Sequence, residues 1–341
     1  MKPLPRAPRH PVGLDGQAAF GTFEGCCEDT CLDARPTSAA TGLVTLEGAG
    51  ERLGLNRLVR EKRWLWFGLA DARLAVGGAI VHLGYLGAIF LWIVDREAKK
   101  LVVDGAATVP PFLVEVSDRP GEGLIARART HRGGLAVRWT HGTVEIRGAA
   151  MGAELSLALA ASTRPLTAVC PVHGTVGGVN VTQKATCLPA SGSVRWGGRL
   201  RTLEHALGSL DYTHGLLARE TAWRWAACWG RGPGGRSVGA NLVAGFNGGL
   251  ENAIWIDGRP RAVGLARFVH DPADPAAPWR VSTDDGQVDL ALRVEAVRTE
   301  DIDVGVASSR FAQPFGAWSG RIGDLEVREL PGVAEHHVAR W

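Results

Sequence analysis

The residues best suited to chemistry gather in one stretch, residues 211–229, which reads DYTHGLLARETAWRWAACW. Asp211 lies three residues before His214, so its carboxylate can orient the imidazole, or the two groups can move a proton together. Glu220 adds a second carboxylate. Asp211, His214 and Glu220 are therefore our candidate catalytic residues. The alternative interpretation of the cluster is a structural salt bridge that caps a loop.

Three tryptophans follow at alternating positions. In an extended strand over residues 220–230, Trp223, Trp225 and Trp229 share one face. Such a face can stack on a flat or polyene ligand, or stabilise a cation through its π electrons. It can also be barrel core, which is the commoner fate of buried tryptophans. Trp223 and Trp225 are taken as ligand-binding candidates.

Further candidates are polar side chains that can orient a molecule inside an apolar pocket. They are Tyr212, Arg219, Asn241, Asn247, Glu251, Asn252 and Lys184. Arg219 can bind an acidic ligand group if it faces the side that bears the tryptophans. In the alternative interpretation, Asn247 only supplies a hairpin turn and Glu251 is solvated.

Composition and missing motifs argue against several classes of function. The net charge is +3, from 38 basic and 35 acidic residues without a long basic block, so we expect no nucleic-acid partner. Walker A, GxSxG and Rossmann motifs are missing, and we expect no cofactor. Cysteine spacing does not fit zinc, HExxH is absent, and we expect no metal site. Reduced thiols at Cys26, Cys27 and Cys31 fit a cytoplasmic protein.

Two segments need separate interpretation. Residues 74–94 are uncharged and long enough for a membrane span. Their glycines and strand-forming residues instead predict two buried strands that meet near Gly84, so we expect no stable membrane insertion.

Near the end of the chain, His336 and His337 are adjacent and cannot both face one site on a strand. We expect this tail to dock Trp341 onto the body of the protein.

The elements that must position these residues are strands. Forty-five glycines and frequent turn signals predict an all-β protein of two antiparallel barrels, or highly curved sandwiches, with little helix. We expect an irregular, loosely attached arm over residues 1–40, a barrel-like domain over 41–164 and a second over 165–341. Residues 202–217 are expected to form a short helix or a structured loop, with Asp211 and His214 at a barrel rim.

Several stretches resemble DUF2804, a bacterial family of uncharacterised proteins. They are LNRLVREKRWLWFGL (55–69), HLGYLG (82–87), LDYTHGLLARETAWRWA (210–226), ANLVAGFNGGLENAIWIDG (240–258), FAQPFGAWSG (311–320) and the terminal AEHHVARW. The family is similar in fold to two-barrel, lipocalin-like proteins, a group with carotenoid hydratases, tocopherol-cyclase-like enzymes and fungal pericyclases. The resemblance implies two β-barrels with an apolar ligand cavity in or between them.

Three functions remain open at this point. The first is a cofactor-free hydratase, isomerase or cyclase that acts on a hydrophobic small molecule through Asp211 or His214. The second is a non-catalytic protein that binds a lipid-like ligand, with Arg219 meeting its carboxylate. The third is a structural or interaction protein without a ligand. The choice depends on whether the tryptophan face lines a cavity or fills a core.

Overall fold

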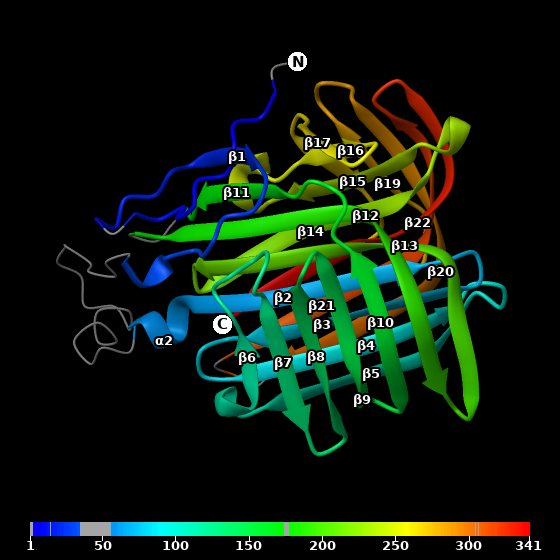
Figure 1. Cartoon of the computed structure of the whole chain (residues 1–341), viewed down its shortest axis with the longest axis horizontal. Coiled ribbons are helices and arrows are strands. Elements are labelled where there is room, and N and C mark those ends of the chain that lie inside the picture. Colours follow the sequence, from blue (N-terminus) through cyan, green and yellow to red (C-terminus); the bar gives the residue numbers. More distant parts are fainter. Residues whose placement is uncertain (1–2, 14, 35–55, 174–176, 304, 306) are drawn as a thin grey trace.

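The structure is a computed structural model, and it describes residues 3–13, 15–34, 56–173, 177–303, 305 and 307–341. Nearly all of the regular structure is β-strand, which confirms the predicted all-β class. The strands form two antiparallel sheets (Figure 1), a nearly closed barrel and a half-barrel.

The first sheet has thirteen strands and curls into the nearly closed barrel, with β6 packed against β2 and β3. Its order is β5-β4-β3-β2-β13-β12-β10-β9-β8-β7-β6, while β11 pairs with β12 and β1 with β11. The strands are β1 Gly21–Glu24, β2 Glu61–Ala70, β3 Leu74–His82, β4 Gly87–Asp95, β5 Lys100–Val109, β6 Val114–Val116, β7 Ile125–Thr130, β8 Gly133–Thr140, β9 Thr143–Ala150, β10 Ala153–Ala160, β11 Leu166–Pro171, β12 Val179–Trp196 and β13 Arg199–Leu216.

The second sheet has nine strands in the order β17-β16-β15-β14-β22-β21-β20-β19-β18 and forms the half-barrel. Its strands are β14 Glu220–Arg231, β15 Ser237–Ala244, β16 Ala253–Ile256, β17 Arg259–Ala262, β18 Ala266–Val269, β19 Trp279–Thr283, β20 Val288–Asp303, β21 Ser308–Ile322 and β22 Leu325–Arg340. The chain passes from the first sheet to the second between Leu216 and Glu220. The domain boundary expected at residue 165 falls inside the first sheet, before β11.

Within the ranges that the structure describes, helical structure is limited to short pieces. These are one α-helix before β2, α2 (Asn56–Arg60), and four 3-10 turns, η1 (Leu32–Ala34), η2 (Pro111–Leu113), η3 (Pro233–Gly235) and η4 (Asn247–Gly249). In the N-terminal arm, β1 pairs with β11, and Val12 and Leu32 are buried against β12 and neighbouring residues. The expected loose attachment is therefore wrong for the described part of this arm, because its apolar side chains join a core.

Residues 202–217 differ from the prediction. Residues 202–216 are neither helix nor loop but belong to β13, which pairs with β12 on one side and β2 on the other, and Leu217 follows the strand. Asp211 and His214 therefore lie within a central strand and do not precede one. The strand was hard to recognise because polar side chains occupy both of its faces, so the apolar alternation that identifies half-buried strands is lost.

Alternation along β2 and β14 separates the barrel cores from the contact between the sheets. On β2, Leu65 and Phe67 fill the first barrel, whereas Trp66 points toward the second sheet. On β14, the side chain of Cys228 enters the half-barrel and that of Trp229 meets Trp66. Each sheet thus buries one face internally and offers an aromatic face to the other sheet.

Gly68 permits this close approach. A Cβ atom at this position would lie 2.4 Å from the Trp66 ring and 2.8 Å from that of Trp229. The absence of a side chain lets two indoles pack over the backbone of β2.

Residues 74–94 form the hairpin of β3 and β4, with Gly84 in the turn at φ 84°, as predicted. Among the described residues, the structure contains no helix long and apolar enough to cross a membrane.

Candidate functional site

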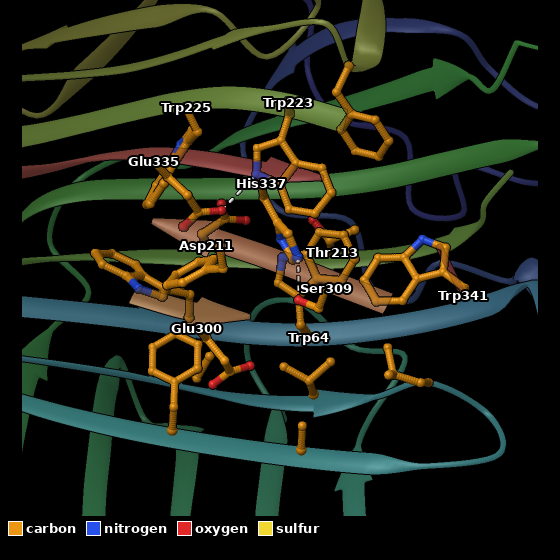
Figure 2. A pocket seen from close by; sticks show the side chains of 18 of the residues that line it. Trp64, Asp211, Thr213, Trp223, Trp225, Glu300, Ser309, Glu335, His337 and Trp341 are labelled. Carbon is orange, nitrogen blue, oxygen red and sulfur yellow. Dashed lines mark hydrogen bonds between the residues drawn. The ribbon is translucent and has the colours of Figure 1, made fainter. Parts of the chain in front are cut away.

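A cavity of about 520 Å³ lies between the two sheets. Its aromatic walls come from both sides: Trp64, Trp66 and Phe90 from the first sheet, and Trp223, Trp225 and Phe311 from the second. The rings of Trp64 and Trp223 stack with centroids 6.1 Å apart and an interplanar angle of 13°. Figure 2 shows that the labelled acidic side chains point into the space between these walls.

The tryptophan face of β14 is both cavity and core. Trp223 and Trp225 line the cavity. Trp229 is fully buried at the contact between the sheets, where its ring packs 6.1 Å from that of Trp66. The change occurs along a single strand face, so strand periodicity alone could not distinguish the two environments.

Asp211 lies at the base of the cavity on β13, directly across the ladder from Lys184 on β12. The ammonium of Lys184 is 2.5 Å from Oδ1 of Asp211 and 2.8 Å from Oε2 of Glu251. Burial raises the pKa of Asp211 to about 6, against the opposing effect of Lys184. Burial would lower the pKa of Lys184, but the two carboxylates outweigh it, and that pKa is raised.

Buried amides fix Glu251 next to this pair. Asn247 donates through Nδ2 to Oε1 of Glu251 over 2.6 Å and accepts from Asn180 over 2.9 Å. Asn241 donates to the carbonyl of Glu251 and accepts the indole N–H of Trp225 over 2.8 Å. Lys184, Asn247 and Glu251 line the cavity, while Asn241 supports them from behind.

Glu335 on β22 is a site residue that the sequence analysis did not select. Its Oε1 accepts the indole N–H of Trp223 over 2.7 Å, and its Oε2 accepts from Nε2 of Gln313 over 2.6 Å. Trp92 donates to the other amide atom of Gln313 over 3.0 Å, which fixes the amide orientation. Burial raises the pKa of Glu335 to about 7. Both carboxyl groups line the cavity (Figure 2), and the negative charge of Asp211 also raises the pKa of Glu335.

The terminal segment contains the signal that could have revealed Glu335. Because β22 alternates, Glu335 and His337 face the cavity, whereas His336 contacts His270 over 3.2 Å on the other side. His337 contacts Ser309 over 2.9 Å, and burial lowers its pKa to about 3. The tail is thus a central strand, and Trp341 at its end does dock, by an indole hydrogen bond to Thr221.

His214 lies on the opposite face of β13 from Asp211 and is not among the described residues that line the cavity. It is held between Thr30 and Glu61, at 2.6 Å from Nδ1 and 2.9 Å from Nε2 respectively. Burial lowers the pKa of His214 to about 4, so the ring is neutral at pH 7. A neutral ring that donates from Nε2 to the carboxylate must accept the Thr30 hydroxyl at Nδ1.

Four other predicted residues also lie outside the cavity lining. Tyr212 points into the first barrel and donates to the carbonyl of Ser117 over 2.9 Å. Arg219 donates to the backbone oxygen of Trp341 over 2.9 Å. Glu220 is exposed at the start of β14. Asn252 is fully buried and links β15 to residue 264 through its amide.

Within the described ranges, no group of three or more histidine, cysteine or acidic side chains is arranged to hold a metal ion.

The sequence profile of the family described as "Domain of unknown function (DUF2804)" matches residues 42–341. The chain belongs to this family. Among curated proteins, no sequence matches it.

Comparison with solved structures finds proteins similar to this DUF2804 protein. The crystal structure of CghA with Sch210972 is 12% identical, covers 82% of this chain and 88% of its own, and has a TM-score of 0.54. A second crystal structure of CghA is 11% identical, covers 94% of this chain and 98% of its own, and has a TM-score of 0.53. Kievitone hydratase from Nectria haematococca is 10% identical over 83% of this chain and 90% of its own, with a TM-score of 0.48. The likeness to CghA shows a shared two-barrel fold.

Proposed function

We propose that this DUF2804 protein binds a hydrophobic small molecule between its two sheets and transfers a proton to it without a cofactor, as a hydratase, isomerase or cyclase. One observation carries the proposal: two buried carboxyl groups, Asp211 and Glu335, line one cavity with aromatic walls, and the charge of Asp211 acts on the pKa of Glu335. Buried carboxyl groups with raised pKa values are typical of general acids and bases.

The surroundings of the two carboxyl groups assign them different roles. Lys184 lies 2.5 Å from Asp211 and stabilises its negative charge. The hydrogen-bond donors to Glu335, Trp223 and Gln313, are neutral, and the charge of Arg298 lowers the pKa of Glu335 by less than burial raises it. A proton shared by the pair therefore resides mainly on Glu335. Glu335 is the proposed acid and Asp211 the proposed base, in place of the pair of Asp211 and His214.

The two carboxyl groups can donate and accept every proton that the reaction transfers. Glu335 gives its O–H proton to one carbon of an alkene, whose π electrons form the new C–H bond, and the other carbon becomes cationic. Water then adds to the cation, or the cation loses a proton from a neighbouring carbon. In either case Asp211 accepts the released proton. Exchange with solvent restores the initial protonation of both carboxyl groups.

The aromatic walls suit such an intermediate. The faces of Trp223, Trp225 and Trp64 offer negative π density to a cation and apolar contact to its neutral precursor. CghA, which has the same fold, was crystallised with a small molecule, Sch210972. That precedent supports binding of a small molecule.

The test follows solvent hydrogen. The protein is purified from its source, its bound molecule is extracted and identified by mass spectrometry, and that molecule is returned to the protein in D₂O. We expect the wild type to incorporate carbon-bound deuterium, and Glu335→Gln to bind equally well but incorporate it about 10²–10⁴-fold more slowly. His214→Gln is the matched control and should incorporate deuterium at the wild-type rate. Equal incorporation by Glu335→Gln would remove the proposed acid.

A second candidate is storage or transport of a lipid-like molecule, favoured by the predominantly apolar walls of the cavity. In that case the wild type binds the extracted molecule and returns it without deuterium. The third possibility, a protein without a ligand, predicts that nothing copurifies and that no apolar probe quenches the fluorescence of Trp223 and Trp225.

A further inference from the structure

A second hollow of about 440 Å³ adjoins the main cavity. It lies where β14 and β15 meet the loop after β11 and the start of β18. Val243, Phe246 and Asn247 line both spaces and therefore form the wall between them. The remaining lining consists mostly of small or aliphatic groups, among them Ala222 and Leu265.

Within this wall, Phe246 is the side chain best placed to move. Val243 is buried at the contact between the sheets, and Asn247 is tied by hydrogen bonds to Asn180 and Glu251. The side chain of Phe246 is only half-buried, with its ring tilted against Trp223 at a centroid distance of 5.4 Å. It follows Gly245, whose φ of 85° is a backbone conformation that favours glycine.

The wall stands next to the carboxyl pair. Phe246 contacts Trp223, which donates to Glu335. Asn247 contacts Glu251, which shares Lys184 with Asp211. A ligand whose reacting carbon lies between the carboxyl groups is therefore close to the wall that contains Phe246.

We propose that the second hollow is a subsite for the aliphatic tail of an elongated ligand, and that Phe246 determines the chain length that the protein accepts. The assignment rests on the proposed function, because it takes the main cavity as the place of the reacting end. The aromatic walls of the main cavity suit an unsaturated head, and the alanines of the hollow suit a narrow alkyl or isoprenoid tail. The ligand class is thus a long-chain molecule and not a compact polycycle.

Ala222 allows the hollow to be closed without altering the main cavity. It lies on the face of β14 opposite to Trp223, lines the second hollow and is exposed. Ala222→Phe fills the hollow, and Ala222→Ser is the matched control that leaves it open. Phe246→Ala removes the wall, and the double variant Phe246→Ala/Ala222→Phe removes the wall but fills the space behind it.

The probes are unbranched primary alcohols of about 8 to 18 carbons, whose affinities should rise about fourfold for each buried methylene. Binding is measured by quenching of tryptophan fluorescence. In the wild type and Ala222→Ser, we expect affinity to keep rising for chains longer than the main cavity holds. Ala222→Phe should bind short alcohols equally and the longest at least tenfold more weakly. In Phe246→Ala, the affinity should keep rising up to longer alcohols than in the wild type. In the double variant, the affinity should stop rising at the same chain length as in Ala222→Phe.

Each failure has a distinct meaning. If the wild type and Ala222→Phe share one chain-length profile, the tail subsite is wrong while binding in the main cavity stands. If the affinity of the double variant rises up to the same chain length as that of Phe246→Ala, the longer alcohols are held in an enlarged main cavity. The proposed tail subsite would then be wrong as well. If no alcohol of any length binds to the wild type, the proposed function itself fails and the subsite with it.

Discussion

The indole of Trp223 donates a hydrogen bond to the carboxyl group of Glu335 over 2.7 Å, so one residue is both a wall of the cavity and a support of its acidic group. The two residues come from neighbouring strands, β14 and β22, which pair in antiparallel register. Aromatic surface and acidity are thus coupled by one contact, and a change to either residue should affect the other.

Replacement of Trp223 by Phe should move the titration of Glu335 to higher pH. The indole N–H stabilises the ionised carboxylate, and its loss raises the pKa further above the value of about 7. A hydrogen bond to a charged group contributes ~1.5–3 kcal/mol, so the midpoint should rise by about one pH unit or more. The carboxyl C=O stretch in infrared difference spectra, assigned with Glu335→Gln, reports the midpoint. Trp225→Phe is the control, because that indole donates to Asn241; an equal shift there would contradict the assignment.

Glu335 should make the protein less stable as the pH rises. Its pKa is about 7 in the folded protein and near 4.5 when unperturbed, so its stabilising contribution is full below pH 4.5 and is lost as pH rises to 7. Burial of Asp211 acts in the same direction, whereas the lowered pKa of His214 acts oppositely. The difference in unfolding free energy between wild type and Glu335→Gln isolates the contribution of Glu335.

We expect that difference to change by about 1–3 kcal/mol between pH 4.5 and 7, in the sense that Glu335→Gln gains relative to the wild type as pH rises. Urea denaturation at fixed pH values measures it. A difference that stays constant over this range would show that Glu335 has an ordinary pKa in the folded protein.

Lys184→Met should strongly destabilise the protein. The substitution leaves the carboxylates of Asp211 and Glu251 buried without their shared cation, and breaking a buried ion pair in this way costs about 3–5 kcal/mol. Arg236→Met is the matched control, because the pair of Arg236 and Asp257 is exposed and should contribute at most about 1 kcal/mol. Urea denaturation compares the two variants, and equal losses would contradict the buried network.

His214→Ala should change stability without changing ligand binding. The side chain joins Thr30 of the N-terminal arm to Glu61 of β2, and loss of two buried hydrogen bonds should cost about 2–4 kcal/mol. Chemical denaturation and quenching by the extracted ligand measure the two effects. A variant with unchanged stability and lost turnover would return His214 to the reaction.

Sequence reasoning predicted the parts of this protein in which one side of a strand is apolar. The β3–β4 hairpin was recognisable because Gly84 interrupts two apolar runs, and the strand over Glu220–Arg231 because its tryptophans alternate. The resemblance to the DUF2804 family predicted two barrels with a cavity in or between them, and the cavity lies between the sheets.

The parts of the fold and the site that the sequence did not predict depend on contacts between strands and between the two sheets. Residues 202–217 did not alternate, because β13 carries Asp211 toward the cavity and His214 toward the N-terminal arm. Glu335 was passed over because its partners, Trp223 and Gln313, lie on other strands. Spacing along the chain says which side chains share a face, but a raised pKa arises from burial, which only the packed structure defines.

The position of β22 has a consequence for how the molecule folds. This strand comes last of all in the described sequence, yet it occupies the middle of its sheet, between β14 and β21. Pairings between distant segments form slowly, because chain entropy is lost before contacts compensate for it. β22 forms a local hairpin with β21, and its pairing with β14 is the distant one. Pulse-labelled hydrogen exchange should therefore find the ladder between β14 and β22 protected later than the local hairpin of β12 and β13. Until β22 docks, the indole of Trp223 lacks its acidic partner, and the protein acquires its chemistry only in a late step of folding.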